Sequence, residues 1–296
     1  MKNLKLYIAI TYGLVWAMGL GFWLSGTDYP SPLGNTLAAA CMFVPLVATL
    51  VCQAASRQPL LRGIGISWRV NRWWFAGWLT IPAIVLLTLL FNYWIDGSHF
   101  TTHSQALQLL CDSISQSSSE EGGNMHLSPS AAVALTFLSG MLAGATINAL
   151  FAFGEESGWR GYLLSQFKGR PFLTAAIATG LVWGLWHAPL ILMGHNYPQH
   201  PNLVGVAAMM LLCIPLSAIL QYFRLKSGSV VVPAIMHGTF NALAGMTALF
   251  MEDYNDLLVG SAGLAGFLAL LVAATVLFLY DRYISRDRLF TSHIDL

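Results

Sequence analysis

Hydrophobic residues in this chain gather into long runs that are separated by short polar stretches. Runs of about 20 apolar residues are long enough to cross a bilayer as α-helices, and no segment has the alternation typical of a β-barrel. The pattern predicts an all-α, polytopic membrane protein, a bundle of eight transmembrane helices. The expected spans are 6–25, 34–54, 73–95, 131–153, 172–193, 203–222, 229–250 and 259–280.

The longest polar segment is 96–129, which contains the sequence SISQSSSEEGGN. This composition favours a flexible loop, which we expect on the extracytoplasmic side. No internal repeat divides the chain, so we interpret 1–296 as a single membrane domain. The first apolar run is longer than the hydrophobic part of a signal peptide and has no cleavage site after it, so we expect it to stay as a helix.

Composition supports the membrane interpretation. Hydrophobic residues make up 56% of the chain and charged residues only 9%, whereas about a quarter of an ordinary soluble domain is charged. The net charge of +1 gives no reason to expect a nucleic-acid partner, and membrane lipids are the expected surroundings. The four cysteines are far apart and form neither a disulfide framework nor a paired metal site.

The basic residues predict the orientation of the chain, because cytoplasmic segments of membrane proteins are rich in Lys and Arg. If the N-terminus is cytoplasmic and the chain crosses eight times, all 14 Lys and Arg residues, Arg62 included, fall in cytoplasmic segments. Both termini are then cytoplasmic, and the short loops are typical of a prokaryotic inner or plasma membrane. The outer segments hold Asp28, Asp96, Asp112, Glu120, Glu121, Glu252, Asp253 and Asp256.

A few ionisable residues lie inside or beside the apolar runs, where each one needs a partner or a function. Glu156 and Arg160 are four residues apart, so they share a helix face and are expected to pair. Glu155 points elsewhere on the helix and has no such local partner. It is therefore the better candidate for a general base, although a solvated charge cluster at a helix end would also explain the pair.

His187 is expected to reach the same depth as Glu155 on a neighbouring helix. The turn at Gly169 joins the two helices, and the two residues lie about 21 and 24 Å from it at 1.5 Å per residue. Gly180 and Gly184 form a face of small residues that allows close helix approach. Taken alone, a buried structural histidine would explain His187 equally well.

His237 and Asn241 form another pair four residues apart, so both project from one helix face. We expect Glu155, His187, His237 and Asn241 to share one cavity in the cytoplasmic half of the membrane. In one chemistry, Glu155 and His187 activate a water while His237 and Asn241 stabilise an oxyanion. In the other, Glu155, His187 and His237 ligate zinc, although no HExxH motif is present.

At these residues the sequence resembles the CAAX-protease and bacteriocin-processing (CPBP, or Abi) intramembrane proteases, which include the CAAX prenyl protease 2 enzymes. The resemblance covers about 140–250, which is the expected catalytic core. Trp183 departs from the family pattern, in which Phe is usual. The three matching motifs are Glu155-Glu156-Ser-Gly-Trp-Arg160, Trp183-Gly-Leu-Trp-His187 and His237-Gly-Thr-Phe-Asn241.

The resemblance implies an eight-helix, glutamate-dependent intramembrane endopeptidase that needs no metal. It implies that Glu155 is the base, that His187 lies beside the water, and that His237 and Asn241 form the oxyanion hole. Glu156, Arg160 and Trp183 would support them. The implied substrate is a peptide or lipidated protein, cut near the cytoplasmic face.

Two other classes stay open. A non-catalytic membrane scaffold or bacteriocin-immunity protein could keep the cavity for binding, and a transporter could use buried carboxylates to carry ions. The sequence shows no pair of broken helices or repeat that would favour a transporter. It leaves the substrate and the oligomeric state open.

Overall fold

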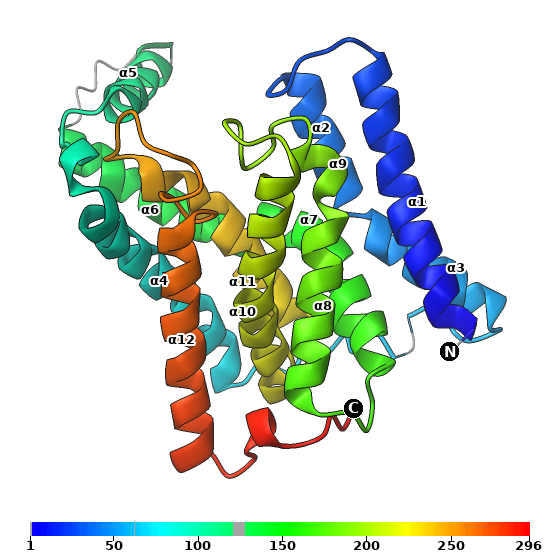
Figure 1. Ribbon diagram of the computed structural model, residues 1–296. Coiled ribbons are helices and arrows are strands. Elements are labelled where there is room, and N and C mark those ends of the chain that lie inside the picture. The colour runs from blue at the N-terminus through cyan, green and yellow to red at the C-terminus, as the bar shows by residue number, and fades with distance from the viewer. Residues whose placement is uncertain (1, 62, 121–127) are drawn as a thin grey trace.

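The computed structural model describes residues 2–61, 63–120 and 128–296, and every named element in these ranges is helical (Figure 1). Two isolated β-bridges are the only β pairings there. The all-α prediction is therefore confirmed. The elements are α1 (Lys2–Leu24), α2 (Pro32–Cys41), α3 (Val44–Ala55), α4 (Arg72–Asp96), η1 (Gly97–His99), α5 (Gln105–Glu120), α6 (Pro129–Ala145), α7 (Ile147–Glu156), η2 (Ser157–Leu163), α8 (Phe172–Trp186), α9 (Ala188–Ile191), α10 (Leu203–Ser227), α11 (Val231–Leu243), η3 (Ala244–Ala248), α12 (Leu264–Tyr283) and η4 (Leu289–Thr291).

Several of these helices are long and apolar enough to cross a membrane. Among the described residues there are five such spans, or six if the bent pair of α6 with α7 and η2 is one span. The bend between the two parts is 45°. The five spans are Asn3–Leu24, Pro32–Ala55, Arg72–His99, Leu203–Ser227 and Leu264–Tyr283.

The predicted number of eight spans is not confirmed, because two of the expected helices are short. α8 has 15 residues and α11 has 13. α8 ends at Trp186 because Pro189 has no backbone N–H and its ring blocks the helix one turn back. Pro189 instead lies in the first turn of α9, which begins at Ala188. α11 tightens into the 3-10 turn η3 rather than continuing to residue 250.

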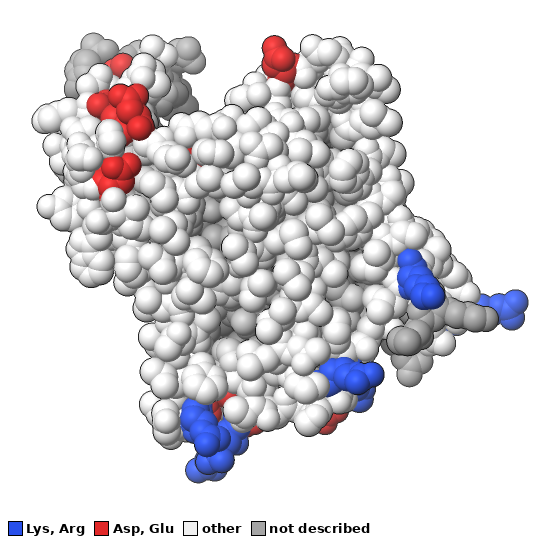
Figure 2. Space-filling view, viewed as in Figure 1, with Lys and Arg blue, Asp and Glu red and all other residues white. Residues whose placement is uncertain are grey.

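Charge divides the bundle into two ends (Figure 2). We call the end with the Lys and Arg side chains the basic end and the opposite one, where Asp and Glu gather, the acidic end. Both marked ends of the chain lie toward the basic end (Figure 1). The predicted segregation is thus visible in space. Arg62 and Glu121 are part of the predicted charge segregation, but they lie outside the described residues.

The segment 96–129, predicted as a loop, is partly helical, and the prediction is wrong for α5. The buried Ser104 hydroxyl accepts a hydrogen bond of 3.1 Å from the Leu107 backbone N–H and so caps the helix. Leu107 is buried, while Leu109 on another side of the helix is 60% exposed. An amphipathic pattern within a polar composition is therefore enough to form this helix.

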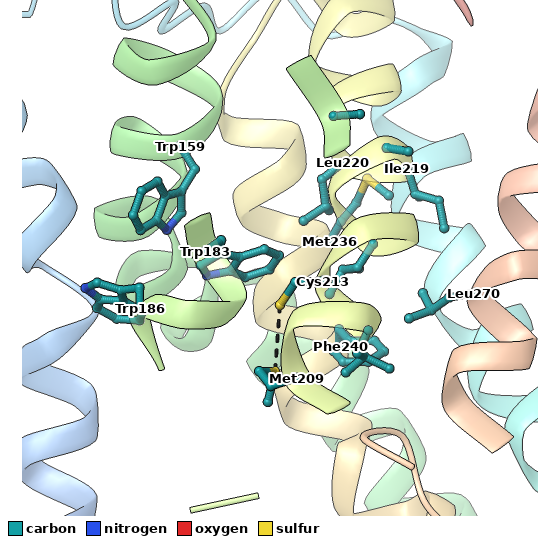
Figure 3. Close-up of a cluster of buried hydrophobic side chains, with 14 of the residues drawn as sticks. Trp159, Trp183, Trp186, Met209, Cys213, Ile219, Leu220, Met236, Phe240 and Leu270 are labelled. Carbon is teal, nitrogen blue, oxygen red and sulfur yellow. Dashed lines mark hydrogen bonds between the residues drawn. The ribbon is translucent and has the colours of Figure 1, made fainter. Parts of the chain in front are cut away.

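The core of the bundle is the contact between α8 and α10. A Cβ atom on Gly184 would lie 2.4 Å from the Cα atom of Met210, and one on Gly180 would lie 2.7 Å from the Cα atom of Ile214. The two helices therefore touch backbone to backbone, which confirms the predicted close approach. Figure 3 shows Trp183 next to Cys213 of α10, with Trp159 and Trp186 further from that helix.

Candidate active site

The two predicted carboxylates end α7, where the helix widens into the π-helical segment η2. Glu155 is 2% exposed and Glu156 is fully buried. The helix continues through Leu163, past residue 153 where the apolar run ends, and single π-helical turns of this kind are frequent at functional sites. Because buried charges need partners, the contacts of each carboxylate decide what it can do.

Glu156 is held by two cationic or polar partners through the same oxygen. Its Oε1 accepts hydrogen bonds from Arg160 Nη1 at 2.9 Å and from His237 Nδ1 at 3.0 Å. The predicted pair with Arg160 is confirmed, and its side chains are almost wholly buried. The contact with His237 joins residues 81 positions apart and was not predicted. Glu156 therefore ties α7 to α11 rather than facing an open space.

Glu155 is held by two indole groups, and its other oxygen is left open. Its Oε2 accepts hydrogen bonds from Trp183 Nε1 at 2.6 Å and from Trp159 Nε1 at 3.4 Å. Among the described residues no side chain or backbone group hydrogen-bonds to Oε1. The sequence offered Glu155 no charged local partner like Arg160, but sequence reasoning overlooked Trp159, which lies four residues further on the helix. The same spacing that predicts the Glu156–Arg160 pair would have found it.

Trp183 lies at the centre of the buried network. Its ring faces the Arg160 guanidinium, which is 4.4 Å from the ring centroid, and packs edge-on against His237 at 5.2 Å. One side chain thus contacts the proposed base, the cation and the second histidine. The sequence assigned Trp183 a supporting role, and a phenylalanine there would keep both ring contacts but not the N–H donor.

Glycines bring α11 close enough for His237 to reach Glu156. A Cβ atom on Gly238 would lie 2.5 Å from both the Ala149 backbone N and the Gly144 carbonyl O. A Cβ atom on Gly144 would in turn lie 2.4 Å from the Thr239 Cα atom. Only glycine permits this approach, so the backbone contact of α11 with α6 and α7 sets the position of His237.

His187 lies at the end of α8, where the helix stops before Pro189. Its Nδ1 lies 2.9 Å from the Trp183 backbone carbonyl O. A carbonyl oxygen only accepts, so in the neutral ring Nδ1 carries the proton and Nε2 keeps a lone pair. His187 can therefore accept a proton or a hydrogen bond through Nε2.

Glu155, His187, His237 and Asn241 all line one cavity of about 400 Å³. The structure thus brings the four predicted side chains together. Sequence reasoning missed most of the remaining wall, because its residues carry no charge and follow no motif. The wall also contains Ala38, Ala39, Met42, Asn148, Phe151, Trp186, Leu190, His195, Asn196 and Ala244.

His195 belongs to the cavity wall, although it is part of none of the three sequence motifs. Its imidazole is half-buried, forms one wall of the cavity, and its Nδ1 hydrogen-bonds to the Tyr29 hydroxyl. The loop between α9 and α10 therefore folds over the cavity.

The cavity extends from the four predicted side chains toward the acidic end of the bundle. The predicted place of the site in the cytoplasmic half of the membrane stays a prediction. His187 lies one turn after Gly184 on α8, and Gly184 packs against Met210 on α10. Met210 therefore marks the approximate depth of His187 along α10. Met210 is about 10 Å from the acidic end of α10 and about 26 Å from its basic end, at 1.5 Å per residue. His195 and Asn196, which also line the cavity, lie in the loop at the acidic end.

The alternative zinc site does not fit this arrangement. Within the described part of the chain, no group of three or more His, Cys, Asp or Glu side chains could hold a metal ion. Glu155 directs Oε2 at two indole N–H groups, and His237 directs Nδ1 at Glu156. We therefore derive no reaction step through a metal.

Comparison with known proteins supports the same region. Residues 136–243 match the family model described as type II CAAX prenyl endopeptidase Rce1-like. The chain is also 27% identical over 144 residues to a CAAX prenyl protease 2 of Methanococcus maripaludis, an alignment that covers 47% of this chain and 50% of the relative. The aligned part thus spans about half the length of the curated relative. Together the two matches support a CAAX protease-like family for this chain.

Proposed function

We propose that the protein is an intramembrane endopeptidase in which Glu155 activates a water molecule. One observation carries the proposal: Glu155 is fixed by two indole N–H groups on Oε2, no described residue hydrogen-bonds to its Oε1, and the side chain lines the cavity. Groups held in this way act as bases without first rearranging. The likeness to a CAAX prenyl protease 2 supports peptide hydrolysis as the reaction.

In the proposed reaction, a water binds between Glu155 Oε1 and His187 Nε2. Glu155 takes one proton from the water as its oxygen attacks the carbonyl carbon of the peptide. The Nε2 lone pair of His187 accepts a hydrogen bond from the other proton and so orients the attack. Because Nδ1 of His187 is held by the Trp183 carbonyl, the ring keeps this orientation.

The carbonyl oxygen becomes negative in this step and needs hydrogen-bond donors. The Asn241 amide supplies one donor from the cavity wall. His237 supplies a second through Nε2 only if its ring is doubly protonated, because Nδ1–H already donates to Glu156. The contact of Nδ1 with the Glu156 carboxylate favours this doubly protonated form, whereas the positive charge of Arg160 opposes it.

The intermediate then collapses. Glu155 passes the proton it took from water to the leaving nitrogen, the C–N bond breaks, and a carboxylic acid and an amine are released. The base returns to its starting state, so the cycle needs neither a cofactor nor a covalent enzyme intermediate.

The proposed substrate class is a peptide segment of a membrane-associated or lipidated protein. The cavity is surrounded by helices whose outer faces are apolar, with exposed residues such as Leu142, Leu150 and Leu185. A substrate anchored in the same membrane reaches such a cavity by lateral diffusion. The alternative of a scaffold or immunity protein keeps the same cavity for binding alone.

The test is cleavage of a panel of membrane-anchored and lipidated peptides by the purified protein in detergent, with products identified by mass spectrometry. The proposal expects cleavage of at least one peptide, unchanged by a zinc chelator. Cleavage that stops with chelator and returns with zinc would contradict the metal-free step. A folded protein that binds these peptides but cuts none would favour the scaffold.

A further inference from the structure

The cavity is closed toward the basic end. On the basic-end side of Glu155, the side chains of Tyr7, Trp159 and Tyr162 are at most 5% exposed, and the Tyr7 ring packs against the other two rings. A Cβ atom on Gly161 would lie 2.9 Å from the Ile64 backbone O, so η2 also seals against the chain before α4. No cavity wall residue comes from this layer, and a peptide entering from the basic end would have to displace a packed core.

The opposite side of the cavity is open. Asn241 and Asn196 line it and are exposed, and Ala39 on α2 and Asn148 on α7 are half-buried in its wall. The exposure of Asn241 is notable because its neighbours His237 and Phe240 are buried. Polar groups in an open wall permit water to enter, which hydrolysis requires.

The mouth lies at the end of the bundle that lacks basic residues. His195 and Asn196 belong to the loop between α9 and α10, in which His200 pairs with Asp256. The Lys and Arg side chains gather at the other end (Figure 2). Segments rich in Lys and Arg stay in the cytoplasm, so the basic end is the cytoplasmic one.

We propose that the cavity opens to the extracytoplasmic side of the membrane and receives its polypeptide from there. The statement about the substrate rests on the proposed function. The family resemblance implied a cut near the cytoplasmic face, whereas here the cut lies in a segment on the outer side of the membrane. The substrate class is then a membrane-anchored polypeptide. Its scissile bond lies next to the membrane anchor, on the extracytoplasmic side.

Thiol accessibility tests the side of access without any need for cleavage. Cys41, Cys52 and Cys213 are buried, and Cys111 is the one partly exposed cysteine among the four. In a Cys111→Ser background, Ala39→Cys places a thiol in the cavity wall and Arg286→Cys places one on the exposed basic end. A small, membrane-impermeant methanethiosulfonate is added either to intact cells or to inverted membrane vesicles.

The proposal expects Ala39→Cys to react in intact cells and Arg286→Cys to react only in inverted vesicles. Reaction of Ala39→Cys in inverted vesicles would overturn it, and so would reaction of Arg286→Cys in intact cells. If Ala39→Cys reacts from neither side although its thiol is free after denaturation, the mouth is closed and the proposal also fails.

The same variant separates this proposal from the proposed function. If the Cys111→Ser parent cleaves a peptide, reaction of Ala39→Cys with the reagent from outside should abolish that cleavage, while the parent is unaffected. If the parent cleaves nothing but Ala39→Cys still reacts only from outside, the catalytic proposal has failed and the side of access stands.

Discussion

The indole Nε1 of Trp183 donates a hydrogen bond of 2.6 Å to Oε2 of Glu155, across 28 residues and between two different helices. The same ring covers the Arg160 guanidinium. This contact fixes the carboxylate that faces the cavity and leaves its second oxygen for a water. The proposed catalysis depends on it.

Trp183→Phe tests the contribution of this donor. The ring contacts with Arg160 and His237 would remain, and Trp159 would still donate to Glu155. A hydrogen bond to a charged group contributes about 1.5–3 kcal/mol, so we expect roughly a tenfold or greater fall in kcat. The melting temperature should also fall, because Trp183 is buried and the smaller ring leaves a gap in the core. Kinetics and thermal melting in detergent measure the two effects. A double variant with Trp159→Phe should lose more, and equal kcat values for all three proteins would contradict the role.

Glu156→Gln should damage the fold more than Glu155→Gln does. It removes the charge that balances the buried Arg160 and His237, and breaking one side of a buried ion pair costs about 3–5 kcal/mol. The expected result is a markedly lower melting temperature for Glu156→Gln. Glu155→Gln is the matched control, since its partners are neutral indoles. A melting temperature for Glu156→Gln equal to that of the wild type would show that Arg160 is balanced in another way.

Gly238→Ala should separate His237 from Glu156. The added methyl group would meet backbone atoms of Ala149 and Gly144 at 2.5 Å, so α11 has to shift away from α7. We expect loss of activity together with about 1–3 kcal/mol of stability, measured by cleavage and by thermal melting. Gly245→Ala is the matched control, because nothing lies within 4 Å of its Cβ position. If both variants behave like the wild type, the glycine contact does not position the histidine.

Asn241→Ala should slow the chemical step without weakening the fold. Its side chain is exposed in the cavity wall, so its removal leaves no buried group without a partner. Loss of one oxyanion donor typically lowers kcat about a hundredfold to a thousandfold. We expect that fall with KM little changed. A rise in KM at constant kcat would instead assign Asn241 to substrate binding.

Local spacing predicted part of the site from the sequence. The Glu156–Arg160 pair follows from the four-residue repeat of a helix, and matching depths along helices predicted that Glu155, His187, His237 and Asn241 share a cavity. The contact between Glu155 and Trp159 has the same four-residue spacing and could have been predicted. It was overlooked because tryptophan is read as an apolar residue in a hydrophobic run, although its indole N–H is a hydrogen-bond donor.

The tertiary contacts and the helix ends were beyond such reasoning. Hydrogen bonds between Glu156 and His237 and between Glu155 and Trp183 depend on how α7, α8 and α11 cross, which apolar runs do not specify. Apolar runs also continue through helix breaks, so they predict one long span where α8 stops before Pro189. The direction in which the cavity opens follows from that stop and from the fold of the loop above it.

The most direct test of the central claim compares wild type and Glu155→Gln on a peptide that the wild type cleaves. Gln keeps the size of the side chain and an oxygen that can accept the indole hydrogen bonds, but it is not a base. We predict an unchanged melting temperature and a fall in kcat of at least about a hundredfold, the usual contribution of a general base. A folded Glu155→Gln protein that cleaves the peptide at the wild-type rate would contradict the claim that Glu155 activates the water.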